Sequence, residues 1–209
     1  MLLEKANQLL ETGPAAARHG AQRDRATNHR KHPGLSLELQ TETSILDLSR
    51  READVALRLV RPKEPALVAR HLGELPLGIF ASEAYLKRRG TPRTLAAAAS
   101  HDWIGYGEAC NHYSQVRWLH RVVRSPRYVL RASTLTTQMI ACAEGIGLAL
   151  LPVFCARNEP RIAQLFTRHA APSRDLWGVF HTDLRVDARI SIFFAWVTAV
   201  LRDHLRRPR

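Results

Sequence analysis

The sequence has few cysteines and no long apolar run. Its 209 residues include 3 cysteines, Cys110, Cys142 and Cys155, which form no CxxC pair and cannot all pair with one another. So sparse a set of thiols argues against a disulfide framework and for a reducing compartment. Charges at Glu4 and Lys5 interrupt the N-terminal apolar residues, which is atypical of a secretory signal. No run approaches the roughly 18 apolar residues of a membrane span, so we expect a soluble, cytoplasmic chain without a membrane partner.

Catalytic and metal-binding motifs are also lacking. The sequence has no GxSxG elbow, no HExxH and no Walker lysine loop. Among its 10 histidines, His29 and His32 lie in a polar stretch that favours a solvated role over metal binding. Cys110 and His112 lack a third residue to orient a nucleophile and a base. We therefore predict no catalytic residue, no metal and no cofactor. An α/β enzyme is the alternative, which a pair of strongly perturbed titratable groups would support.

Acidic residues are few relative to basic ones. The chain has 31 lysines and arginines against 19 acidic residues, a net charge of +12. The excess lies mainly in residues 18–32, 117–131 and 202–209. Such a field attracts nucleic acid, an acidic partner or an anionic ligand. Because aromatic side chains are not interleaved with these arginines as stacking platforms, the pattern favours a solvated basic surface over a nucleic-acid groove.

Short apolar segments alternate with helical ones from Pro33 onward. A hydrophobic content of 45% is enough for an ordinary core. The predicted strands are residues 35–40, 54–60, 75–81, 102–106, 127–132, 147–152 and 175–181, and the predicted helices are residues 41–52, 133–145 and 187–205. A strand, helix, strand unit with so long a connection requires a parallel crossover. The pattern predicts an α/β fold with two parallel units, one on each side of about residue 82.

The segment ACAEGIGLALLP, residues 141–152, contains a Gly-Ile-Gly that resembles part of a phosphate-binding loop. A phosphate cradle needs its glycines between a strand and the following helix. Here Gly145 and Gly147 follow a helix and precede a strand. We predict that Gly145 is a left-handed C-cap and that Gly147 allows the chain to turn tightly into the next strand.

Hydroxyl-bearing residues follow two of the predicted strands, where ligands of open α/β sheets bind. Backbone N–H groups, hydroxyls and the helix dipole together can seat an anion there, and ordinary N-capping is the alternative. An arginine at a third strand end could clamp a carboxylate, and a tyrosine at a fourth could line the pocket or only pack. The predicted ligand-binding residues are Thr41, Thr43, Arg58, Tyr106, Ser133 and Thr134.

The order of motifs from about Pro33 to Leu205 resembles the effector-binding (substrate-binding) domain of LysR-type transcriptional regulators. The residues that carry this resemblance are HPGLSLEL, ADVALRLVRP, LVARHLGELPLGIFASEAYLKRRGTPRTLAAAASHDWI, ACAEGIGLALLP and ARISIFFAWVTAVLRDHL. The resemblance implies two Rossmann-like subdomains, similar to type 2 periplasmic binding proteins, with a small effector in a hinge cleft. It implies the same six ligand-binding residues.

The resemblance also implies a domain organisation. Residues 1–32 correspond to part of the linker and dimerisation helix with a basic stretch, 33–81 with 162–209 to subdomain I, and 82–161 to subdomain II. The family's winged helix-turn-helix and the first strand of subdomain I have no counterpart in the sequence, which leaves open a truncated regulator with impaired binding.

The implied function is that of a non-enzymatic regulatory domain. It would bind a small anionic metabolite, a carboxylate, and form a homodimer or homotetramer. It would reach DNA only through the missing N-terminal domain. A solute-binding protein of the same fold is the alternative.

Overall fold

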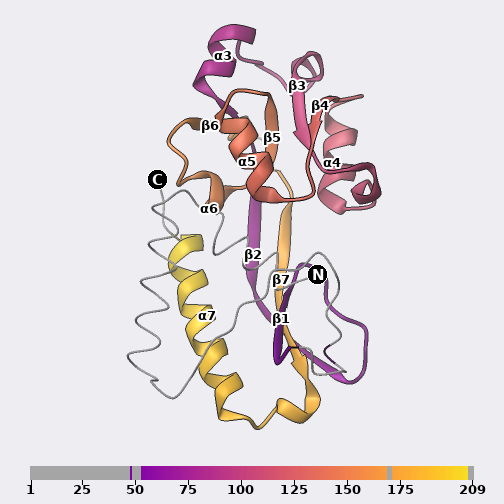
Figure 1. Ribbon diagram of the computed structural model, residues 1–209, viewed down its shortest axis with the longest axis vertical. Coiled ribbons are helices and arrows are strands. Elements are labelled where there is room, and N and C mark those ends of the chain that lie inside the picture. Colours follow the sequence, from indigo (N-terminus) through magenta and orange to yellow (C-terminus); the bar gives the residue numbers. More distant parts are fainter. Residues whose placement is uncertain (1–47, 49–52, 169–170, 207–209) are drawn as a thin grey trace. The chain divides into compact units, whose positions relative to one another are not determined.

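The computed structural model describes Leu48, residues 53–168 and residues 171–206 (Figure 1). The predicted linker helix, the strand at 35–40, most of the helix at 41–52 and the absent first strand lie outside the described residues, as do Thr41 and Thr43. The chain divides into two compact units, unit 1 (Met1–Leu75 with Arg174–Arg209) and unit 2 (Pro76–Ser173). The predicted subdomain boundaries, after residues 81 and 161, stay a prediction.

The sheet of unit 1 is built around its C-terminal strand. Strand β7 (Ser173–His181) pairs antiparallel with β1 (Val55–Arg58) in the register Val55↔Phe180. On its other side β7 neighbours β2 (Leu67–Ser82), whose first half belongs to unit 1. A 3-10 turn, η4 (Thr182–Leu184), leads from β7 into helix α7 (Ala188–Arg206). The strands predicted at 54–60 and 175–181 and the helix predicted at 187–205 are thus confirmed.

Side chains alternate between the two faces of this sheet. On one face Leu48, the sole described residue of the predicted helix at 41–52, packs with Ala56 and Val179. On the other face α7 lies so close that a Cβ added to Gly178 would stand 2.2 Å from the Phe194 ring. The Phe180 and Phe194 rings meet there, with centroids 5.4 Å apart. Unit 1 therefore buries apolar side chains on both faces of its sheet.

Unit 2 contains the parallel α/β part of the fold. Strands β3 (Asp102–Gly105), β4 (Arg127–Arg131) and β5 (Leu148–Pro152) form a sheet in which β3 runs parallel to both neighbours. Helix α4 (Ser114–Val122) connects β3 to β4, and α5 (Leu135–Ala143) connects β4 to β5. These two crossovers confirm the predicted α/β class.

The remaining elements complete the edge of unit 2. The end of β2 pairs antiparallel with β5 and with β6 (Ile162–Leu165). The other elements are α3 (Glu83–Arg89), α6 (Val153–Ala156), and the 3-10 turns η2 (Ala97–Ser100) and η3 (Glu108–Cys110). Within the described residues, no helix combines the length and the apolar character needed to cross a membrane.

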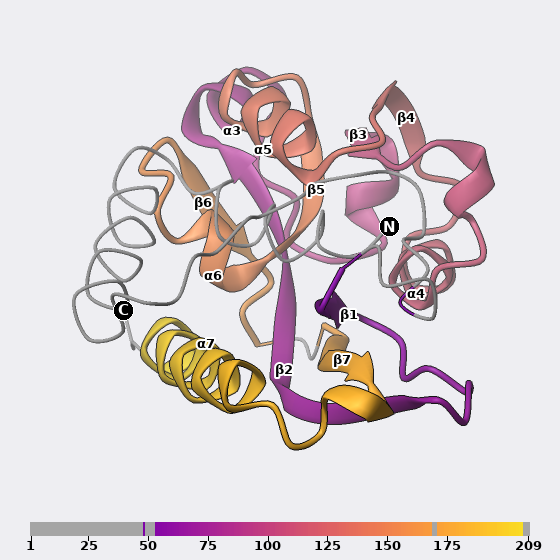
Figure 2. The ribbon, with the colours of Figure 1, turned by 60° about the horizontal axis from the view of Figure 1, so that its bottom comes forward.

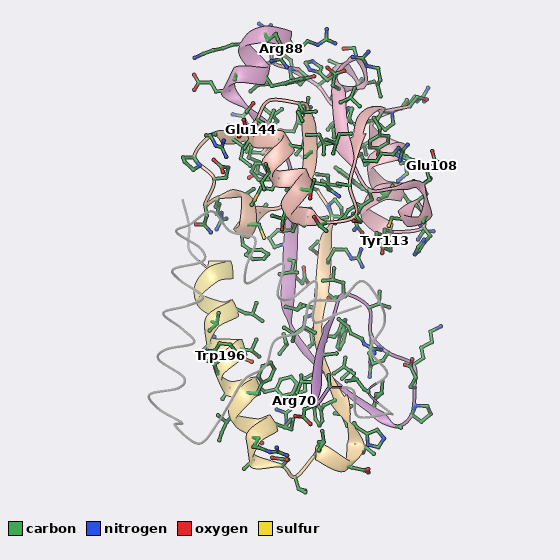
Figure 3. All side chains as sticks on the ribbon, viewed as in Figure 1. Arg70, Arg88, Glu108, Tyr113, Glu144 and Trp196 are labelled. Carbon is green, nitrogen blue, oxygen red and sulfur yellow. The ribbon has the colours of Figure 1, made fainter. Side chains whose placement is uncertain are left out.

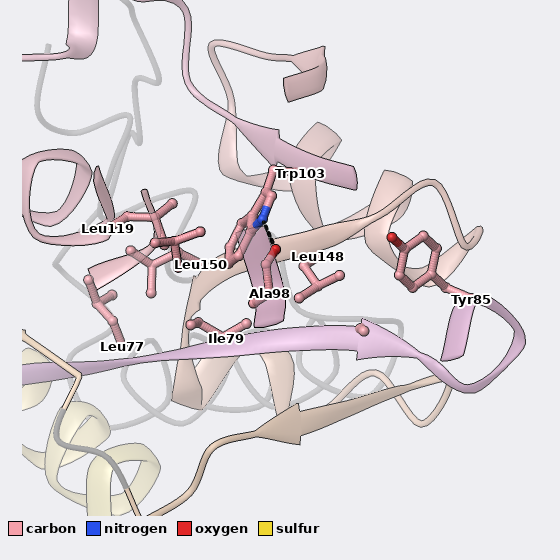
Figure 4. Packing of buried hydrophobic residues seen from close by; sticks show 10 residues of the cluster. Leu77, Ile79, Tyr85, Ala98, Trp103, Leu119, Leu148 and Leu150 are labelled. Carbon is pink, nitrogen blue, oxygen red and sulfur yellow. Dashed lines mark hydrogen bonds between the residues drawn. The ribbon is translucent and has the colours of Figure 1, made fainter. Parts of the chain in front are cut away.

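The core of unit 2 is centred on Trp103 (Figure 4). Its side chain is fully buried among Leu77, Ile79, Leu148 and other apolar residues. The indole Nε1 donates a hydrogen bond of 2.9 Å to the carbonyl of Ala98, which ties the core to η2. The polar atom of this large ring is therefore satisfied, as burial requires.

Both glycines of the Gly-Ile-Gly segment have the backbone roles predicted for them. Gly145 has φ = 79° and donates to the Cys142 carbonyl, and Ile146 donates to the Ala141 carbonyl, which is the Schellman pattern of a helix end. Gly147 passes so near β3 that an added Cβ would stand 2.6 Å from the Asp102 carbonyl oxygen. The segment ends one helix and begins a strand, and it holds no phosphate loop.

A buried histidine makes the stability of unit 2 sensitive to pH. Tyr85 Oη accepts a hydrogen bond from the Asp102 N–H (2.8 Å), so the Tyr85 hydroxyl donates to Nδ1 of His101 (3.3 Å). Burial, aided by the charge of Arg89 and opposed by Asp102, holds the pKa of His101 below its ordinary value. The folded chain therefore binds fewer protons than the unfolded chain near and below the ordinary pKa of about 6.5.

We expect the free energy of unfolding to fall as the pH drops from 7 through 6 towards the lowered pKa of His101, because protonation breaks the bond from Tyr85. Urea unfolding between pH 7.5 and 5 measures this loss. His101→Gln should flatten the curve in that window. Arg89→Gln should raise the pKa of His101 in an NMR titration, since it removes a lowering charge. An unchanged pH dependence in His101→Gln would assign the effect to other groups.

Candidate functional site

Three of the predicted ligand-binding residues lie at one edge of the unit 2 sheet. Strands β3 and β4 are parallel and adjacent, so their carboxyl ends meet, and the Ala132 N–H donates 2.9 Å to the Gly105 carbonyl. Tyr106 directly follows β3, and Ser133 with Thr134 follows β4. The structure thus brings Tyr106, Ser133 and Thr134 to the carboxyl edge of this sheet, where helix α5 begins.

Thr134 is the N-cap of α5. Its Oγ1 accepts from the Thr137 N–H (3.2 Å) and shares a hydrogen bond with the Thr137 hydroxyl (2.8 Å). Thr134 therefore caps α5, and its role in ligand binding stays a prediction. Ser133 is exposed, and no partner for its hydroxyl occurs within the described part of the chain. Of the two residues, Ser133 is the one with a hydroxyl left for a ligand.

Residues that the sequence analysis missed position this edge. Gln138 is buried and donates from Nε2 to the Ala132 carbonyl (3.0 Å), which holds the turn before Ser133. Arg131 donates to the Tyr106 carbonyl (3.1 Å), and its guanidinium lies 4.2 Å from the centroid of the Tyr128 ring. A polar residue on the otherwise apolar face of a helix was the signal available for Gln138.

Aromatic and acidic side chains border the same edge. The Tyr106 and Tyr113 rings meet edge to face with centroids 5.7 Å apart. A carboxylate oxygen of Glu108 lies 3.8 Å from a guanidinium nitrogen of Arg131. Figure 3 labels both Glu108 and Tyr113 in this part of unit 2. The edge therefore offers a hydroxyl, a helix N-terminus, a phenol and an arginine that is partly neutralised by a glutamate.

Arg58 lies in unit 1, at the end of β1 opposite Trp177 of β7. Its Nε is buried and has no hydrogen-bond partner among the described residues. A buried guanidinium N–H without an acceptor is costly, and a ligand anion would satisfy it. The neighbouring Arg61 instead lies over the Trp177 ring, 5.4 Å from its centroid.

Among the described residues, potential metal ligands do not cluster, and one of the three cysteines has an unreactive thiol. No three of the described His, Cys, Asp and Glu side chains gather as metal ligands would. Burial raises the pKa of Cys142 to about 12, which keeps that thiol protonated and unreactive at neutral pH. His112 packs its ring against Tyr113, with centroids 4.7 Å apart.

The parallel α/β sheet of unit 2 presents hydroxyl groups at its strand ends, where ligands of open α/β sheets bind. Residues 26–202 match the LysR substrate binding domain, and the chain belongs to that family. The family's members are transcriptional regulators and not enzymes, so the predictions of an effector-binding domain and of a non-enzymatic function are confirmed.

Curated relatives are regulators of transcription. The chain is 25% identical over 182 residues to the HTH-type transcriptional regulator CrgA of Neisseria meningitidis serogroup C, covering 84% of this chain and 60% of CrgA. It is 23% identical over 170 residues to the HTH-type transcriptional activator AaeR of Escherichia coli K12, covering 78% of this chain and 54% of AaeR. The chain thus spans about 60% or less of the length of these relatives.

Solved structures share the fold. The CrgA regulatory domain from Neisseria meningitidis has a TM-score of 0.72 at 23% identity, with 84% of this chain and 88% of that chain covered. The Synechocystis CcmR regulatory domain in complex with 2-PG has a TM-score of 0.68 at 16% identity, with 88% and 92% covered. At these identities the comparisons establish the fold alone.

Proposed function

We propose that the chain senses a small anionic metabolite, a carboxylate, and controls transcription through a DNA-binding domain outside the described residues. The observation that carries the proposal is the meeting of Tyr106 and Ser133 at the carboxyl edge of β3 and β4, beside the N-terminus of α5. Free N–H groups and the positive end of the helix dipole favour an anion there.

The proposed ligand-binding residues remain Thr41, Thr43, Arg58, Tyr106, Ser133 and Thr134. The unsatisfied Nε of Arg58 supports an anionic ligand. Because the Thr134 hydroxyl caps α5, the proposal gives the direct hydroxyl contact with the ligand to Ser133. Binding would shift the balance between two arrangements of a homodimer or homotetramer in the cytoplasm, and so change how DNA-binding domains are spaced.

A thermal-shift screen of carboxylates, aromatic acids and amino acids against this chain tests the proposal. A ligand at 100 times its Kd should stabilise the fold by about 2.7 kcal/mol, which a shift in Tm reports. A screen in which neutral amides stabilise the chain as well as their carboxylates would contradict an anionic effector.

Ser133→Ala and Thr134→Ala should have opposite signatures. Ser133→Ala should weaken the effector by about 1 kcal/mol and leave unfolding unchanged, because its hydroxyl has no partner in the described chain. Thr134→Ala should cost about 1 kcal/mol of stability, because it removes the cap of α5.

Calorimetric titration with the effector from the screen measures the first effect, and urea unfolding measures the second. Ser114→Ala, an exposed serine in the first turn of α4, is the matched control and should change neither quantity. If Ser133→Ala binds the effector as tightly as the wild type, Ser133 is not a ligand contact.

A further inference from the structure

Unit 1 contains a pocket of about 420 Å³ between the first half of β2 and helix α7. Figures 1 and 2 show α7 running beside this part of β2. Its lining comes from Arg70, His71 and Leu72 of β2 and from one side of α7. The volume lies within the range of sites that hold small molecules, roughly 300–1,000 Å³. None of the proposed effector residues lines it.

Two arginines give the pocket its charge. The guanidinium of Arg70 lies 5.1 Å from the centroid of the Phe194 ring and 6.0 Å from that of Phe180. Such stacking anchors the guanidinium at the wall of the pocket, while the Arg70 side chain as a whole stays exposed. Figure 3 places Arg70 beside α7. Arg202 contributes the second guanidinium from the last turns of the helix.

Within the described residues, no carboxylate pairs with Arg70 or Arg202. Asp175, an acid on the neighbouring strand β7, is bonded to Nε2 of His71 at 2.8 Å. Both guanidiniums therefore keep their N–H donors for an anion that comes from outside. A carboxylate is the acceptor that fits the planar guanidinium fork.

The rest of the lining is apolar with two hydroxyls. The apolar surface comes from Leu72, Ala195 and Ala199, and Ser191 with Thr198 adds O–H groups. Phe194, which is 3% exposed, lies behind this surface. The α7 residues recur at three- and four-residue intervals, so they form one continuous face of the helix. A bare inorganic anion would leave this apolar surface in contact with water, whereas a ligand with an apolar body would cover it.

We propose that this pocket is a second ligand site, which takes a small carboxylate with an apolar body. The carboxylate is bound by Arg70 and Arg202, and the apolar part lies against Leu72 and the small side chains of α7. The site is separate from the proposed effector site, because it uses neither the strand ends of unit 2 nor Arg58.

The test uses the whole chain and the probe 4-phenylbutyrate, with its neutral amide and inorganic phosphate as comparison ligands. Calorimetric titration should show saturable binding of 4-phenylbutyrate at least about tenfold tighter than of the amide or phosphate. Arg202→Gln and Arg70→Gln should each weaken the carboxylate about tenfold and leave the amide unchanged.

Two further variants secure the result. Ala195→Leu fills the pocket from an exposed position and should abolish binding while the chain still folds. Arg185→Gln removes the same charge from an exposed position of unit 1 outside the pocket. This variant should bind 4-phenylbutyrate as tightly as the wild type does.

Equal binding of the amide, equal effects of Arg185→Gln and Arg202→Gln, or unaltered binding in Ala195→Leu would overturn the second site. Weakening of 4-phenylbutyrate by Ser133→Ala alone would place the probe at the unit 2 edge and would also overturn it. If Arg202→Gln loses binding of 4-phenylbutyrate but still responds normally to the effector found by screening, the second site is separate from the site of the proposed function.

Discussion

Trp103→Ala is expected to lower the free energy of unfolding by about 4 kcal/mol. The Trp103 side chain is fully buried at the centre of the unit 2 core. Truncation loses its apolar burial and leaves a cavity that the surrounding strands can only partly fill. It also leaves the Ala98 carbonyl without its 2.9 Å hydrogen bond. A loss of this size is a large part of the stability of an ordinary domain.

Urea unfolding followed by far-UV circular dichroism measures the effect of Trp103→Ala. Trp103→Phe keeps much of the ring and loses the N–H, so it should fall between the wild type and Trp103→Ala. Val186→Ala is the control at the other extreme, because that side chain is 94% exposed. Its effect should stay within about 0.5 kcal/mol. Equal losses in the Trp103 and Val186 variants would mean that unit 2 has no such core.

The strands of the parallel part were predictable because apolar residues fill them almost completely. Trp103 and Ile104 in β3 and the run Leu148–Leu151 in β5 are buried on both sides of the sheet. Such short apolar runs, bounded by turn residues, are the strongest strand signal in an α/β protein. The glycines at 145 and 147 were predictable for a related reason, since their order after a helix and before a strand allows few backbone roles.

Helix α4 was not predicted, because its charge hid its periodicity. Residues 117–131 were interpreted as a basic stretch, yet within α4 Val116 and Leu119 are buried while Arg117, His120 and Arg121 are exposed. Two or three apolar residues at helical spacing among arginines are too few to distinguish an amphipathic helix from a solvated segment by sequence. The strand that begins β2 was missed for a comparable reason, because exposed Arg70, His71 and Glu74 interrupt its apolar alternation.

The candidate sites show the same limit. Tyr106, Ser133 and Thr134 could be placed together from the sequence, because the carboxyl ends of parallel strands meet by geometry. The roles of Arg131 and Gln138 depend on the backbone carbonyl to which each side chain donates. Arg131 reaches the Tyr106 carbonyl, 25 residues away, and Gln138 reaches the Ala132 carbonyl, 6 residues away. The pocket of Arg70 and Arg202 joins residues from the two separate chain segments of unit 1, and no local pattern in the sequence indicates such a pair.

Gly147→Ala is expected to destabilise the chain by about 2 kcal/mol, although the substitution adds a single methyl group. The new Cβ would stand 2.6 Å from the Asp102 carbonyl oxygen and 2.9 Å from its carbon. Both are backbone atoms of the first residue of β3. The next residue, Trp103, pairs with Leu148 of β5, so this part of the backbone is held in the sheet. The strain can be relieved only by moving one strand, so it cannot be absorbed by a side-chain rotation.

Gly107→Ala is the matched control, because an added Cβ there meets nothing within 4 Å and the backbone has φ = −59°. It should be neutral or slightly stabilising, by up to about 1 kcal/mol. Urea unfolding of both variants gives the difference in the free energy of unfolding. The two glycine variants also test whether Gly147 has a backbone role or binds phosphate. Substitution of a phosphate-binding glycine would lower the affinity for anions with little loss of stability. A stable Gly147→Ala that binds inorganic phosphate less well would contradict a purely structural glycine.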